Sequence, residues 1–271
     1  MKQRTLTAFV MALVLIPILI IGNTYQIFNL LILVLIGLAS YELTTVFQKG
    51  KSLPTWLTGF YIAASLVTGT VFYYALTEVL PWNIFFISFL SIFFIQMFFL
   101  VFVKNYDSIE FGKGFVVIYY ASLGFASISF LRDLGITTVL YVILIAIFTD
   151  TFAYLFGVKY GKHKIAPLIS PKKSVEGSIA GFIFGGGIGT IFALFFPVLD
   201  LHFVWILIIS FFISILGQIG DLVASKFKRD SDVKDYSALL PGHGGILDRF
   251  DSMIFVSLSF TLLYLVMSAA L

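Results

Sequence analysis

Three aspartates near the C-terminal end have the spacing expected of a metal site. Asp248 and Asp251 are three residues apart at the start of an apolar segment, so a helix would project both from one face. Asp221 lies inside the preceding apolar segment, where a charged side chain is costly and needs a reason. Carboxylate oxygens are the ligands that Mg²⁺ prefers, and the ion commonly joins them to substrate phosphates. The three residues therefore predict a magnesium site.

The stretch between these acids is rich in charge. Residues 225–251 read SKFKRDSDVKDYSALLPGHGGILDRFD and hold five of the 17 basic and five of the 14 acidic residues of the chain. Pro241 to Gly245 form a flexible turn that would let the backbone approach a ligand closely. His243 in this turn is expected to donate to a phosphate or to orient the loop, and a purely structural turn histidine is the alternative.

A second basic segment runs from Lys159 to Glu176 and contains five lysines and one acid. Ser170 to Ser174 read SPKKS, which predicts a shaped turn with clustered donors for phosphate. The alternative is that the lysines only fix the orientation of the chain and attract anionic lipid headgroups.

The elements that must hold these groups are strongly apolar. The chain has 271 residues, of which 60% are hydrophobic and 11% charged, whereas a typical soluble domain has roughly 25% charged residues. It contains no cysteine, which excludes disulfides and thiolate metal sites. The net charge of +3 is small for a nucleic-acid binder, so no nucleic-acid partner is expected.

Apolar segments of membrane-spanning length recur along the whole chain. They cover about 5–22, 26–47, 55–77, 83–103, 114–131, 136–158, 175–197, 202–225 and 250–270. Helices are the form that satisfies every backbone polar group in lipid. The sequence therefore predicts an all-α, polytopic transmembrane protein with about nine spans. We expect one domain, 1–271, with an N-terminal helical region (1–135) and a catalytic region (136–271) that carries cytoplasmic loops 159–174 and 226–249.

The basic residues predict the orientation of these spans. If the N-terminus and every second loop lie on one side, that side receives all 17 lysines and arginines except Arg132. The positive-inside rule then places the N-terminus in the cytoplasm, in a multi-pass protein of the cell membrane whose active site faces the cytoplasm. Glu42 and Asp150 would lie near cytoplasmic helix ends, where they either reach water or serve a function.

The seventh span carries glycines four residues apart, at positions 177, 181, 185 and 189. The stretch Gly185 to Gly189 lies in an apolar helix with no preceding strand, so close helix packing is a better interpretation than a nucleotide loop. This face can pack within one chain or between two chains of a homodimer.

These motifs resemble the integral-membrane phosphatidate cytidylyltransferases, also called CDP-diacylglycerol synthases. The signature of that family is filled without departure by Ser225, Phe227, Lys228, Arg229, Lys234, Asp235, Pro241, Gly242, His243, Gly244, Gly245, Asp248, Arg249 and Asp251. The likeness extends upstream through DTFAY at 150–154, GKH at 161–163, SPKKS at 170–174 and Glu176-Gly177. The N-terminal half matches only as apolar spans, plus Tyr41-Glu42-Leu43.

The resemblance implies a reaction of CTP with phosphatidate that gives CDP-diacylglycerol and pyrophosphate, with Mg²⁺ and in the lipid bilayer. Asp221 and Asp248 would hold the metal with support from Asp251, and Asp150 would shape the pocket or contact a second cation. Phosphates and pyrophosphate would be bound by Lys172, Lys173, Lys228 and Arg229. The remaining substrate contacts would come from Ser170, Ser225, Lys234, Asp235, Gly244, Gly245 and Arg249.

Keeping two acyl chains in lipid predicts a cleft between helices that opens sideways to the bilayer. Three other functions stay open at this point. They are a membrane enzyme using CTP on another lipid (a polyprenol or phytol kinase, or an archaeal-lipid cytidylyltransferase), a secondary transporter, and a lipid-binding scaffold. The scaffold would leave Asp221, Asp248 and Asp251 unexplained.

Overall fold

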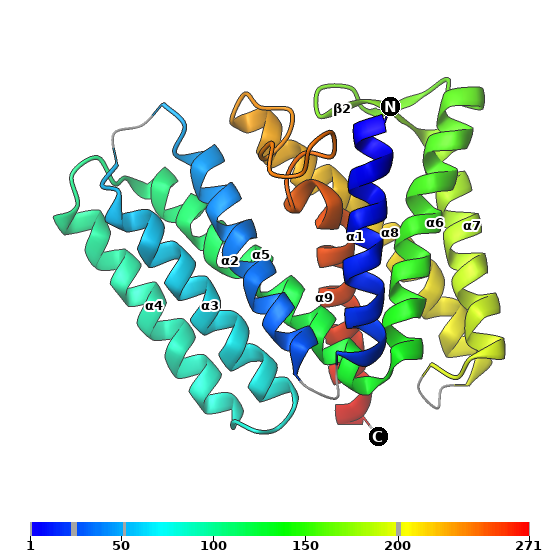
Figure 1. Ribbon diagram of the computed structural model, residues 1–271, viewed down its shortest axis with the longest axis horizontal. Coiled ribbons are helices and arrows are strands. Elements are labelled where there is room, and N and C mark those ends of the chain that lie inside the picture. The colour runs from blue at the N-terminus through cyan, green and yellow to red at the C-terminus, as the bar shows by residue number, and fades with distance from the viewer. Residues whose placement is uncertain (1, 23–25, 51–52, 199–201, 271) are drawn as a thin grey trace. The chain divides into compact units, whose positions relative to one another are not determined.

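The predicted succession of membrane-spanning helices is confirmed by a computed structural model that describes residues 2–22, 26–50, 53–198 and 202–270 (Figure 1). The described residues form nine helices, of which eight, α2 to α9, are long and apolar enough to cross a membrane. The helices are α1 (Lys2–Ile21), α2 (Ile27–Phe47), α3 (Trp56–Leu76), α4 (Trp82–Phe102), α5 (Ser108–Leu134), α6 (Ile136–Tyr160), α7 (Val175–Phe195), α8 (Phe203–Asp230) and α9 (Leu247–Ala270).

Several helices extend beyond the apolar segments that predicted them. α5 begins at Ser108 rather than 114, α8 ends at Asp230 rather than 225, and α9 begins at Leu247 rather than 250. Polar residues stabilise these extensions. At the start of α5, for example, Asp107 Oδ1 accepts the backbone N–H groups of Ile109 and Glu110, both at 2.9 Å. Apolar composition predicts the part of a helix that lies in lipid. The helix itself can continue into polar residues when side chains cap its end.

A small hairpin is the exception to the all-α prediction. β1 (Lys164–Ala166) pairs antiparallel with β2 (Ser170–Ser174), and these are the strands of the described chain. The SPKKS segment was predicted as a turn and is instead strand β2, because the turn lies earlier, at residues 167–169. Pro167 favours that turn, since its ring fixes the backbone dihedral φ.

The chain divides into two compact units, and each is described by itself. The N-terminal unit consists of Met1–Phe130 and Ser231–Arg249, and the C-terminal unit of Leu131–Asp230 and Phe250–Leu271. Residues 231–249 group with the N-terminal helices by their contacts. The predicted single domain, with regions 1–135 and 136–271, stays a prediction.

In the N-terminal unit, α3 packs against both α2 and α4. α4 exposes the rings of Phe86, Phe94 and Phe98, as expected of a helix that faces lipid. Its opposite face packs aromatic rings against neighbours, for example Phe89 against Tyr119 of α5 with ring centroids 4.8 Å apart.

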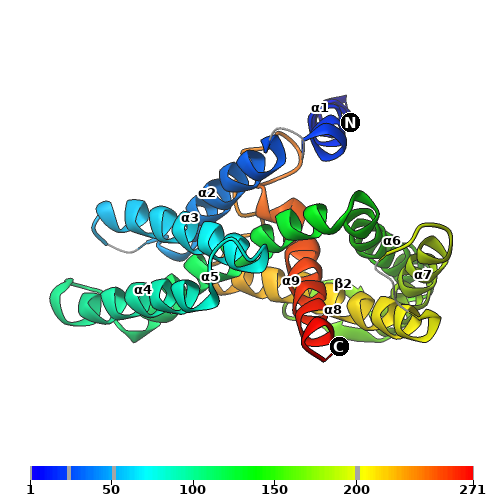
Figure 2. The same ribbon diagram turned by 90° about the horizontal axis from the view of Figure 1, so that it is seen from below.

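In the C-terminal unit, α7 packs between α6 and α8 (Figure 2). The glycine face of α7 lies directly against α6, so the prediction of close helix packing is confirmed within the chain. A Cβ built on Gly181 would lie 2.6 Å from the carbonyl oxygen of Thr149, and one built on Gly185 would overlap the hydroxyl of the same residue. Larger side chains would therefore push α7 away from α6.

Candidate functional site

The charged loop 231–246 of the N-terminal unit is held by two carboxylates. Asp248 Oδ2 accepts the backbone N–H groups of Tyr236 (2.8 Å) and Gly245 (2.9 Å), and the second bond lies just before the start of α9. Glu42 of α2 accepts the hydroxyl of Ser237 (2.6 Å) and the N–H groups of Ile246 (2.9 Å) and Leu247 (3.0 Å). Both carboxylates are buried, at 9% and 2% exposure.

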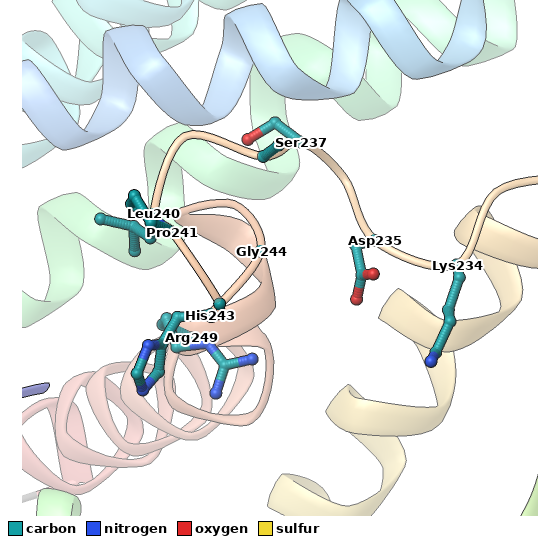
Figure 3. A pocket seen from close by; sticks show the side chains of 10 residues that line it. Lys234, Asp235, Ser237, Leu240, Pro241, His243, Gly244 and Arg249 are labelled. Atoms are coloured by element: carbon teal, nitrogen blue, oxygen red, sulfur yellow. The ribbon is translucent and has the colours of Figure 1, made fainter. Parts of the chain in front are cut away.

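This loop forms a pocket of about 490 Å³, within the range of small-molecule sites. Figure 3 shows Lys234 and Asp235 on one arm of the loop and His243 with Arg249 across the pocket. A tight turn presents His243, because its N–H donates to the carbonyl of Leu240 at 2.8 Å. The predicted substrate residues Lys234, Asp235, His243, Gly244 and Arg249 thus line one pocket.

One ring nitrogen of His243 has no hydrogen-bond partner among the described residues. The His243 Nδ1 atom is buried and has no hydrogen-bond partner within the described part of the chain. A buried polar atom without a partner is costly, so a ligand that bonds to it would remove that cost. The role of His243, in binding a ligand or in shaping the turn, stays a prediction.

The C-terminal unit brings together a second set of predicted residues. Lys173 of β2 donates from Nζ to Asp221 Oδ2 at 2.7 Å and to the carbonyl of Gln218 at 3.0 Å. The Lys173 side chain is 9% exposed, whereas that of Asp221 is 30% exposed. The lysine is therefore fixed by α8, while the aspartate remains reachable from outside.

Two further carboxylates lie near this ion pair. Asp150 Oδ2 accepts the hydroxyl of Ser252 at 2.8 Å. Asp150, Asp221 and Asp251 lie close enough to repel one another electrostatically, and Lys228, which is 8% exposed, attracts Asp251. Three carboxylates beside two lysines leave a negative charge that a metal ion would help to balance.

The arrangement fits Mg²⁺ with few protein ligands. No group of three or more histidine, aspartate or glutamate side chains is placed to hold a metal ion within residues 2–22, 26–50, 53–198 and 202–270. Mg²⁺ usually keeps several waters and is held by one or two carboxylates together with substrate phosphates. Asp221 and Asp251 of the C-terminal unit fit that requirement. The predicted ligand set of Asp221, Asp248 and Asp251 stays a prediction.

The other predicted residues lie around these two groups. Arg229 is exposed, and its Nε donates at 3.3 Å to the carbonyl of Ile169, which fixes the end of α8 to the turn between β1 and β2. Lys172 is exposed on β2, whereas Ser170 on β2 and Ser225 on α8 are half-buried. Lys172 is thus free to reach a ligand from the hairpin.

An apolar groove of about 350 Å³ lies beside Lys173 in the C-terminal unit. It is formed by α7 and α8, and Ile179, Phe182, Ile215 and Ile219 contribute to its lining. Its apolar lining suits an acyl chain, and the predicted cleft that opens sideways to the bilayer stays a prediction. The neighbouring Asp221 is not sealed off, since its side chain is 30% exposed.

Sequence reasoning left Glu42 open and did not select Ser237, Gln218 or Ser252. Glu42 had a signal, because an acid inside an apolar segment is costly unless it has partners. The other three had none, since a serine or glutamine in a helix or loop is common. Their roles depend on contacts between residues up to 195 positions apart, as for Ser237 and Glu42.

Comparison with known proteins matches this chain over nearly its whole length. Residues 2–267 match the cytidylyltransferase family. A Staphylococcus haemolyticus protein named phosphatidate cytidylyltransferase is 38% identical over 257 residues, which is 94% of this chain and 96% of that protein. Proteins of the same name from Staphylococcus aureus and Staphylococcus epidermidis are 38% and 34% identical with the same coverage. The chain is therefore a nucleotidyltransferase that belongs to the cytidylyltransferase family.

Proposed function

We propose that this protein transfers the cytidylyl group of CTP to phosphatidate and releases pyrophosphate. The observation that carries the proposal is the cationic, nucleotide-sized pocket at the start of the membrane-spanning helix α9. A charged pocket at the start of such a helix supports a reaction between a soluble nucleotide and a lipid. The relatives named phosphatidate cytidylyltransferase, which match 94% of this chain, support the same reaction.

The chemistry joins two anions. An oxygen of the phosphatidate phosphate attacks the α-phosphorus of CTP, a new phosphorus–oxygen bond forms, and the bond to the pyrophosphate breaks. A phosphate monoester is largely ionised at neutral pH, so the attack needs no strong base. The protein contributes positioning and charge neutralisation, as is general for phosphoryl-type transfers.

CTP is proposed to bind in the pocket of the N-terminal unit. Lys234 and Arg249 would neutralise phosphate charge, and the unpartnered Nδ1 of His243 would bond to the nucleotide. Gly244 and Gly245 would allow the backbone to approach it closely. Lys228 and Arg229 are proposed to bind the phosphates that leave as pyrophosphate.

Phosphatidate is proposed to use the C-terminal unit. Lys172 and Lys173 would attract its phosphate, and an acyl chain would lie in the groove formed by α7 and α8. The chains would then stay in an apolar environment, which matters because transferring them to water costs about 0.8 kcal/mol per CH₂. CTP would arrive from the cytoplasm, the side on which the basic loops are expected.

Mg²⁺ is proposed as the cofactor. When bound, the ion would neutralise charge on the phosphates and help to align them. Asp221 and Asp251 would hold it, with Asp248 as the third predicted ligand. Asp150 would shape the pocket or contact a second cation.

The test uses the purified protein with phosphatidate in detergent micelles, radiolabelled CTP and Mg²⁺. We expect CMP-labelled lipid and its loss on chelation of Mg²⁺. We also expect activity to fall about 10- to 100-fold for Asp221→Asn, the range typical of substitutions at a metal site. Asp230→Asn is the matched control, because that residue lies on the same helix and is 54% exposed in a pair with Lys226. Full turnover by Asp221→Asn at saturating Mg²⁺ would contradict the metal assignment.

A folded protein that labels no phosphatidate would overturn the substrate assignment. Labelling of a polyprenol or an archaeal ether lipid in the same assay would then identify the alternative acceptor, and a product that retains only a phosphate would indicate a kinase. Cation flux in proteoliposomes without CTP would support the transporter.

A further inference from the structure

Glu42 is distant in sequence from the charged loop, yet it contacts three points of that loop. It lies on α2, in a segment whose other side chains are mostly apolar. Its Oε1 accepts from Ser237 and Ile246, and its Oε2 accepts from Leu247. Each oxygen therefore acts as an acceptor, and the side chain has to be a carboxylate rather than an amide to accept all three bonds.

The turn next to Glu42 is shaped around it. A Cβ built on Gly245 would lie 2.5 Å from Oε1 and 2.6 Å from Oε2 of Glu42. Gly244 has a φ of +80°, and a Cβ there would lie 2.7 Å from Asp248 Oδ2. Two consecutive glycines are thus required because two carboxylates pack against them, which gives the Gly244-Gly245 part of the PGHGG turn a physical reason.

Glu42 also acts on the start of α9. Ile246 and Leu247 are the residues at which that helix begins, and their N–H groups have no acceptor within the helix. A negative charge at this end is favourable to the helix dipole. Glu42 consequently fixes the place where α9 starts and, with it, the position of Arg249 in the pocket.

We infer that Glu42 is a positioning residue that holds the loop 234–247 in the shape that binds the nucleotide. The inference rests on the proposed function, because it takes the pocket as the CTP site. Glu42 does not line the pocket and acts through Ser237, Gly245 and the first turn of α9. Its loss should therefore weaken CTP binding more than it changes the reaction of bound CTP.

The first test is Glu42→Gln, which keeps the size of the side chain and places an NH₂ group against a donor. We expect the KM for CTP to rise about tenfold while kcat and the KM for phosphatidate change less than about threefold. Glu110→Gln is the control, since Glu110 is as buried (2% exposed) but lies on α5 with Lys113 as a partner at 3.3 Å. A fall in kcat with an unchanged KM for CTP, or no effect, would overturn the inference.

The second test is a double-mutant cycle with Gly245→Ala, and its first arm uses a wild-type Glu42, so that arm stands also where Glu42 variants do not accumulate. Gly245→Ala should raise the KM for CTP on the wild-type background, because its methyl group meets the Glu42 carboxylate. On a Glu42→Ala background the space is free, so the further effect should be smaller. Equal effects on both backgrounds would show that the two residues act independently.

Equilibrium binding of radiolabelled CTP without lipid separates this inference from the proposed reaction. Weaker binding by Glu42→Gln than by wild type supports the role of Glu42, whichever lipid is the acceptor. Equal binding by the two proteins overturns it, even where the wild type converts phosphatidate.

Discussion

At the scale of single residues, the carboxylates differ in what their oxygens accept. Glu42 and Asp248 accept backbone N–H groups of one loop, whereas Asp221 accepts from the ammonium group of Lys173 and keeps an exposed side. The first two stabilise a loop conformation. Asp221 belongs to an ion pair whose exposed side a substrate or a metal ion can reach. A substitution of its partner, Lys173, therefore tests what the pair contributes.

Lys173→Met should lower both stability and activity. The change leaves Asp221 without its partner, and breaking a buried pair costs about 3–5 kcal/mol, which we reduce to about 1–3 kcal/mol because Asp221 is 30% exposed. Thermal unfolding in detergent should show a Tm lower by several degrees. Lys172→Met is the control, since that residue is exposed on the same strand. Equal Tm values for the two variants would contradict a stabilising ion pair.

Sequence alone predicted which residues line the pocket better than it predicted which residues hold the pocket in shape. Lys234, Asp235, His243 and Arg249 were selected from a motif, and they line one pocket. The role of Glu42 was left open, because burial and three donors from residues about 200 positions away are tertiary facts. Residue types indicate which chemistry is available, whereas the fold decides which oxygens are already occupied.

At the scale of elements, the packing of α7 on α6 allows a sharp comparison between two glycines. Gly185→Ala should destabilise the protein by about 1–3 kcal/mol, because the new methyl group overlaps Thr149. Gly187→Ala, two residues away, has nothing within 4 Å of its Cβ and should be neutral or stabilising, since alanine favours helix. Thermal unfolding of both variants checks this, and an equal loss would mean that α6 and α7 pack more loosely.

The helices were predictable from apolar runs because lipid leaves few alternatives to a helix. The hairpin of β1 and β2 was not, because five residues of SPKKS contain no clear alternation and two of them are lysines. Its strand form depends on pairing with residues 164–166, which no local pattern indicates.

At the scale of the whole molecule, the predicted order of the spans is confirmed, whereas their division into two regions stays a prediction. Residues 231–249 form a charged loop between two apolar helices, but composition alone does not indicate that this loop groups with the first 130 residues. The bonds of Glu42 with Ser237 and Leu247, which lie 195 and 205 residues away, connect this loop to α2.

The orientation in the membrane can be tested on a single helix. The chain has no cysteine, so one introduced thiol is a clean reporter. Asn83 and Lys104 are exposed at opposite ends of α4. In intact cells, an impermeant maleimide should label Asn83→Cys and should label Lys104→Cys only after permeabilisation. The reverse pattern would place the N-terminus outside.

The discontinuous N-terminal unit sets an order of events during synthesis. α2 is made early, whereas Ile246, a donor to Glu42, follows 204 residues later. At about 5–20 residues per second, the Glu42 carboxylate waits about 10–40 s before its donors exist. Until then α2 carries an unsatisfied acid in a nascent membrane protein, and a ribosome that stalls in between would leave a chain whose first unit is incomplete and open to degradation.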